Sequence, residues 1–143
     1  MTLLRGLIGV LVALAVTVGF VQFLELMLAN ALAGHPLQSM ADYAVVLNTV
    51  PVMIARVLIT TLLAILGGYL CAKIAEHDEM RYTLIAAIFR VIAIVFGDVQ
   101  GYIPATTPAW MLGVILVIST LALLAGGAVR AAAASLERRR QNP

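Results

Sequence analysis

The stretch that decides the fold runs from residue 51 to residue 73: PVMIARVLITTLLAILGGYLCAK. A helix over it is roughly 33 Å long at about 1.5 Å of rise per residue, which matches the hydrocarbon thickness of a bilayer. Pro51 suits a first helical turn, where its missing N–H is not needed, and the charge of Lys73 favours headgroups and water. The stretch therefore predicts a membrane-spanning helix. It also contains residues that are unusual on a lipid-facing surface: Arg56, Thr60, Thr61, Gly67 and Gly68.

The composition of the whole chain indicates the same class of protein. Of the 143 residues, 63% are hydrophobic and 11% are charged, and the mean hydropathy is +1.07. Soluble domains carry about 25% charged residues, so a soluble fold of this length could not hide so much apolar surface. We therefore expect an integral membrane protein. The single cysteine, Cys71, excludes an intramolecular disulfide and a cysteine-cluster metal site.

Three further apolar runs predict three more spans. The first begins like a signal peptide, with Arg5 ahead of an apolar core and Ala29-Asn30-Ala31 as a candidate cleavage site. Because signal cores are usually only about 7–15 residues long, we interpret this run as a retained span and keep the signal peptide as the alternative. The predicted fold is an all-α, four-helix transmembrane bundle forming a single domain over residues 1–143. Its spans lie at about 3–32, 51–74, 82–100 and 109–132, followed by a basic, frayed tail at 133–143.

Basic residues outside the spans all lie on one side of the predicted bundle. The loops at 33–50 and 101–108 contain no lysine or arginine, and residues 37–47 of the first could form a short helix on the membrane surface. Positive charge is retained in the cytoplasm, so we expect both termini and the polar turn at 75–81 to be cytoplasmic. The residues that carry this signal are Arg5, Lys73, Arg81, Arg130, Arg138, Arg139 and Arg140.

The spans also share patterns in pairs. Residues 59–62 and 67–68 match residues 118–121 and 126–127, each with a hydroxyl-containing segment followed by a glycine pair. This favours two parallel helical-hairpin repeats, related by an axis along the membrane normal. The alternative is that apolar, glycine-containing helices look alike by composition. In either case small residues permit close helix packing, and the candidates for packing positions are Thr60, Gly67, Gly68, Gly97, Gly126 and Gly127.

Five polar residues form a candidate intramembrane layer: Gln22, Glu25, Arg56, Arg90 and Asp98. A charge at the bilayer centre costs about 2.5–3.5 kcal/mol on insertion scales, so each needs a partner or a path to water. Helical rise from the basic anchors places Glu25, Arg56 and Asp98 about 26–30 Å away from them, near the outer interface. We expect a Glu25–Arg56 pair, with Asp98 as a competing acceptor. The pair is either a structural lock between helices or part of a site for an ion, a proton or a ligand carboxylate.

Arg90 has no acid at its own depth, because it lies only about 14 Å from Arg81 along the helix and thus near the bilayer midplane. We expect it to face the bundle interior and to reach Asp98, Gln22 or backbone carbonyls. The alternatives are a lipid headgroup or a partner subunit.

Motifs for catalysis and for cofactors are missing from the sequence. His35 and His77 lie in a loop and a turn, no histidine and acid cluster at metal-ligand spacing, and no phosphate loop or dinucleotide fingerprint occurs. We expect no catalytic residues, no metal and no cofactor.

A resemblance follows from Arg56 in a span ending GGYLCAKIA (67–75), a later P-x-W (108–110) and a last span ending GGAVR (126–130). With these features the chain resembles small uncharacterised bacterial inner-membrane proteins with four predicted helices. The resemblance implies a bacterial inner membrane and brings no activity or site residue. Small multidrug transporters also have four helices and an intramembrane glutamate, but Glu25 lies too near the outer end, and the loops are too long, for that family.

Three functions stay open from the sequence. The first is a non-enzymatic accessory subunit or homo-oligomer, held in the lipid bilayer or in a larger membrane complex by polar pairs and glycine faces, with no role for nucleic acid. The second is a small dimeric transporter or channel, which requires the polar layer to line a water-accessible cavity. The third is a membrane enzyme, for which we find neither a nucleophile nor a metal site.

Overall fold

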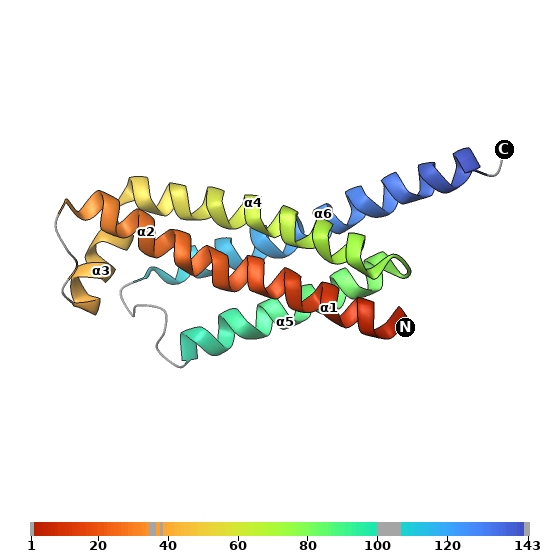
Figure 1. The fold of residues 1–143 in the computed structure, drawn as a ribbon. Helices are drawn as coiled ribbons and strands as arrows, with labels where there is room; N and C mark the ends of the chain where they lie inside the picture. The colour runs from red at the N-terminus through yellow and green to blue at the C-terminus, as the bar shows by residue number, and fades with distance from the viewer. Residues whose placement is uncertain (1, 35–36, 38, 100–106, 142–143) are drawn as a thin grey trace.

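The described part of the chain is all-helical, with no strand. The structure is a computed structural model that describes residues 2–34, 37, 39–99 and 107–141. The loop at 101–108 therefore lies for the most part outside the described residues. The elements are α1 (Thr2–Leu14), η1 (Ala15–Phe20), α2 (Val21–Ala33), α3 (Met40–Leu47), α4 (Val50–Ala75), α5 (Glu79–Val99) and α6 (Ala109–Gln141). As Figure 1 shows, α1, η1 and α2 follow one another as a single long helix.

Four helices are long and apolar enough to cross a membrane by their length and composition. They cover Leu3–Ala33, Val50–Ala75, Glu79–Asp98 and Ala109–Glu137. This confirms the prediction of an all-helical chain with four helices of spanning length, which indicates a multi-pass membrane protein. The orientation of the termini and the hairpin repeat stay predictions.

The bundle has two distinct ends (Figure 1). The start of α1, the turn between α4 and α5, and the end of α6 lie at one of them, which we call the termini end. The short helix α3 lies at the opposite end, which we call the α3 end. At the termini end, Arg5 pairs with Glu76 in the α4–α5 turn.

The last helix continues through most of the segment that the sequence predicts to be a frayed tail, as far as Gln141. Residues 133–141, AASLERRRQ, are mostly alanine, leucine, glutamate, arginine and glutamine, which favour helices. Arg130 Nη1 also lies 3.4 Å from Glu137 Oε2, two turns further along the same helix. The tail therefore projects from the bundle as a helix (Figure 1).

Local capping defines the end of α2 and the start of α3. Gly34 ends α2 with a φ of 68°, a left-handed conformation that glycine adopts without strain. Ser39 Oγ accepts a hydrogen bond from the Asp42 N–H at 3.1 Å, which caps the start of α3. The helix expected within residues 37–47 is thus present at Met40–Leu47. It packs on α2 and α4 through a small apolar cluster of Ala29, Leu47 and Val52.

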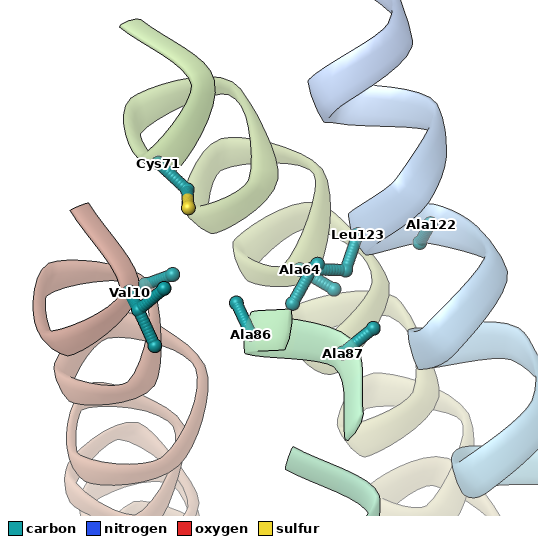
Figure 2. Packing of buried hydrophobic residues seen from close by; sticks show 8 residues of the cluster. Val10, Ala64, Cys71, Ala86, Ala87, Ala122 and Leu123 are labelled. Atoms are coloured by element: carbon teal, nitrogen blue, oxygen red, sulfur yellow. The ribbon is translucent and has the colours of Figure 1, made fainter. Parts of the chain in front are cut away.

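The main core lies in the half of the bundle toward the termini end. Figure 2 shows its small side chains meeting between α1, α4, α5 and α6. Because most of them are alanines, the helix backbones can approach closely. The buried members of the cluster are Val10, Ala13, Ala64, Cys71, Ala86, Ala87, Ala122 and Leu123.

Glycines bring α4 and α6 into backbone contact. A Cβ added at Gly68 would overlap the carbonyl oxygen of Leu123, and one at Gly126 would overlap that of Ile65. Such contact requires residues without a side chain. The other two glycines of these pairs face different helices, with Gly67 against Thr17 and Gly127 against Thr83.

Candidate functional site: a polar cavity within the bundle

A partly open cavity of about 420 Å³ lies toward the α3 end, between η1, α2, α4, α5 and α6. It exists because α5 packs on α1, η1, α4 and α6 but makes no contact with α2 among the described residues. In Figure 1 the last turns of α5 lie well apart from α2. The polar lining residues are Thr17, Gln22, Glu25, Arg56, Thr60 and Arg90; the others are Val18, Val21, Ala93, Ile94, Phe96, Gly97, Leu112 and Ile115.

An ion pair crosses from α2 to α4 at this cavity. Arg56 Nε lies 3.2 Å from Glu25 Oε1, and the two residues are 6% and 5% exposed. The structure thus brings together the two charges that depth alone placed at one level. The Nε–H does not point at the carboxylate in hydrogen-bond geometry, so the contact is electrostatic.

Two donors beside this pair have no hydrogen-bond partner among the described residues. They are Arg56 Nη1 and Thr60 Oγ1, and both atoms are buried. Arg56 and Thr60 lie four residues apart on α4, so they share one helical face, and both line the cavity. Buried donors without acceptors are unfavourable, because they have given up their bonds to water.

Arg90 is held by a hydroxyl and a backbone carbonyl. It is 2% exposed, its Nε donates to Ser119 Oγ at 3.2 Å, and its Nη1 donates to the Thr17 carbonyl oxygen. Of the partners expected from the sequence, the backbone carbonyl is the one found. Neither Asp98 nor Gln22 is within hydrogen-bonding distance.

The carbonyl that receives Arg90 belongs to a π-helical turn. Thr17 lies in η1, where the wider turn loosens the usual backbone ladder, and its side chain donates back to the Ala13 carbonyl oxygen at 2.7 Å. Inserted π turns leave a carbonyl available for another donor and often occur at functional sites. η1 thereby supplies an acceptor for a buried guanidinium that no acid neutralises directly.

The remaining predicted site residues divide between the cavity and the surface. Gln22 lines the cavity with an exposed side chain, whereas Asp98 is exposed and is not among the lining residues. Gly97 also lines the cavity, and a Cβ there would meet no atom within 4 Å, so it makes no tight helix contact. Four of the five residues of the expected polar layer therefore share one cavity.

Sequence reasoning missed Ser119 and did not identify which backbone carbonyl receives Arg90. Ser119 lies about 15 Å along α6 from its start, a depth similar to that of Arg90. Applying the same depth arithmetic to hydroxyl groups as well as to charges would have paired these residues. The Thr17 carbonyl carries no such signal, because no residue pattern in the apolar run specifies a π turn.

Helix α3 places a phenol near the ion pair. Tyr43 is partly buried against α2 and α4. Burial raises the pKa of the Tyr43 phenol, the negative charge of Glu25 raises it further, and Arg56 opposes this with a lowering effect. The phenol is therefore neutral at physiological pH. Helix α3 lies about one helical turn from the ion pair, because its Leu47 packs on Ala29 and Val52, which are four residues from Glu25 and Arg56.

The cavity lining combines charged and hydroxyl groups with apolar side chains. Two guanidinium groups and one carboxylate give it one net positive charge. The described residues contain no group of three or more histidine, cysteine or acidic side chains that could hold a metal ion. No protein-family model, curated protein or solved structure matches this chain.

Proposed function

We propose that this protein is a small non-enzymatic membrane protein of the transporter type, which binds a solute in the cavity at the α3 end. The observation that carries the proposal is that Gln22, Glu25, Arg56 and Arg90 line one partly open cavity. A purely structural polar layer would instead be expected to form closed pairs in a dry bundle. The volume and the largely apolar lining with a few convergent polar groups are typical of small-molecule sites, which span about 300–1,000 Å³.

An assembly role, the first function that the sequence favours, has less support. It relies on glycine faces to attract another subunit. Gly68 and Gly126 are instead engaged within the bundle, where α4 and α6 touch, and Gly67 and Gly127 face Thr17 and Thr83. We therefore place an accessory subunit or homo-oligomer second.

The proposed orientation has both termini in the cytoplasm of a bacterium and the protein in its inner membrane. The uneven distribution of arginine and lysine supports this orientation. The loops at 33–50 and 101–108 contain neither residue, whereas the termini and the turn at 75–81 contain several. In this orientation the cavity lies in the outer half of the membrane.

Cysteine accessibility tests both the cavity and its side. In a Cys71→Ala background, Gln22→Cys and Gly97→Cys introduce thiols at the cavity, and Leu58→Cys introduces one on the exposed apolar surface of α4 at a similar depth. We expect a membrane-impermeant thiol reagent added to intact cells to modify the two cavity thiols much faster than the control. Equal and slow modification of all three would contradict a solute-accessible cavity.

A further inference from the structure

The cavity lacks one negative charge. Its ionisable lining groups are the guanidiniums of Arg56 and Arg90 and the carboxylate of Glu25. Arg90 is satisfied by neutral acceptors, which accept its hydrogen bonds without cancelling its charge. Because charges in a low-dielectric interior need counter-charges, an anion is the ligand that would complete this set.

The buried side-chain atoms of the cavity residues that make no hydrogen bond can all donate one. Arg56 and Thr60 line the cavity, and the two residues are 6% and 2% exposed. Arg56 Nη1 and the Thr60 hydroxyl are themselves buried and have no acceptor among the described residues. A hydroxyl can also accept, but a guanidinium can only donate. An oxyanion offers several acceptor oxygens, and a guanidinium fork binds carboxylate and phosphate oxygens with matched geometry. A bound cation would leave these donors unpaired and would compete with Arg56 for Glu25.

The rest of the cavity favours an apolar body on the ligand. Much of the apolar lining comes from Ile94 and Phe96 on α5 and from Leu112 and Ile115 on α6. Phe96 is 58% exposed, so the cavity reaches the apolar surface of the bundle where α5 stands apart from α2. A ligand with a short or long hydrocarbon chain could bind here and extend toward the bilayer.

We propose that the cavity binds an amphipathic anion, with a phosphate or carboxylate group on Arg56 and Thr60 and an apolar chain along α5 and α6. This inference rests on the proposed function, since it assigns a chemical class to the solute of the same cavity. The anion is either a water-soluble organic acid or the headgroup of a membrane lipid.

The test measures stabilisation of the full-length protein in dodecyl maltoside. Cys71 is the single cysteine and is fully buried, so a thiol-reactive fluorophore reports unfolding directly. The probes are octyl phosphate, octyl glucoside with the same tail and a neutral head, and inorganic phosphate with no tail. We expect octyl phosphate to raise the unfolding temperature most, because only it supplies both the charge and the apolar chain. Adding phosphatidic acid or phosphatidylcholine then separates the sources: stabilisation by phosphatidic acid identifies a lipid headgroup, and its failure while octyl phosphate succeeds identifies a soluble anion.

Variants locate the binding. Arg56→Met and Thr60→Val should weaken octyl phosphate binding, the first by about tenfold or more. Glu25→Gln should strengthen it, because it frees Arg56 and raises the net charge of the cavity. Lys73→Met removes an exposed cation outside the cavity and should leave binding unchanged. If Arg56→Met fails to fold, octyl phosphate binding by the other two variants still tests the site, because Thr60→Val should weaken it and Glu25→Gln should strengthen it.

The outcomes separate this inference from the proposed function. Equal stabilisation by octyl glucoside and octyl phosphate would overturn the anion and leave a solute-binding cavity. Equal octyl phosphate binding by Glu25→Gln, Thr60→Val and the unmodified protein would also overturn it, because the anion would then bind elsewhere. If no probe stabilises the protein and the cavity thiols stay unmodified, both proposals fail.

Discussion

The ion pair between Glu25 and Arg56 should contribute strongly to stability, and its effect can be worked out from the geometry. At the 3.2 Å between Arg56 Nε and Glu25 Oε1, Coulomb's law gives roughly 5 kcal/mol of attraction at an effective dielectric constant of about 20. Desolvation of two ions offsets much of this, so the pair as a whole contributes little. Removing one partner is different, because the other is left buried and uncompensated, which typically costs about 3–5 kcal/mol.

We therefore expect Arg56→Met to lower the free energy of unfolding by about 3 kcal/mol, at the low end because the contact lacks hydrogen-bond geometry. For a chain of this size that corresponds to a fall of roughly 10 °C in unfolding temperature. The measurement is thermal unfolding in dodecyl maltoside, followed through the reaction of buried Cys71 with a thiol-reactive fluorophore. The exposed Lys73→Met variant serves as the control and should change it little.

The double variant Glu25→Gln/Arg56→Met decides whether the pair is the cause. With both charges removed no ion is left stranded, so the double variant should be more stable than the sum of the two single losses predicts. Strictly additive losses would refute the reasoning, because they would mean that Arg56 stabilises the fold through packing alone. A double variant less stable than that sum would refute it as well.

Further variants test the helix contacts, the anchor of Arg90 and the phenol near the ion pair. Gly68→Ala should destabilise the protein by about 1–3 kcal/mol, since the new Cβ would overlap the backbone of α6. Gly113→Ala should be neutral or stabilise by up to about 1 kcal/mol, because no atom lies within 4 Å of its new Cβ. Thermal unfolding compares the two variants. Ser119→Ala removes an acceptor of the Arg90 guanidinium and should cost about 1.5–3 kcal/mol in the same assay, and no loss would mean that this bond is dispensable. Because the pKa of Tyr43 is raised from 10.0 in the folded protein, the folded state holds its proton more tightly, so its contribution to stability is present at neutral pH and is lost as pH rises above 10.0. Tyr43→Phe should reduce this loss of stability in unfolding measured at several pH values, and identical pH profiles would contradict it.

The fold could be predicted from the sequence because bilayer thickness constrains it so strongly. The run from Pro51 to Lys73 has the length of a span, and three comparable runs leave few other arrangements. Depth arithmetic also brought Glu25 and Arg56 to one level, since a helix converts residue number into height. These predictions work where one regular element determines the geometry.

The rest depends on how the helices tilt and on irregular turns. Asp98 is at the depth of the ion pair, yet it is exposed, because the end of α5 stands apart from α2 and a height does not specify a direction. Arg90 is held by the π turn η1 and by Ser119. The first is a backbone irregularity and the second is an uncharged side chain, so a search for opposite charges finds neither. The cavity itself follows from these features, so no single segment of sequence encodes it.

The size of the side chains explains why the bundle closes at one end and opens at the other. Toward the termini end, Gly6 lies under the Tyr82 ring and Gly9 lies against the backbone of Cys71, while Gly68 brings α4 onto α6. These contacts bring the helix backbones close together around the small residues of the core. Toward the α3 end, the buried guanidiniums of Arg56 and Arg90 occupy the interior and the helices stand further apart. Under the proposed function, a solute would enter the cavity where the end of α5 stands apart from α2. If the protein moves a solute as proposed, passage to the termini end would require helices that touch there to separate, and the close contact of α4 with α6 at Gly68 is one such contact.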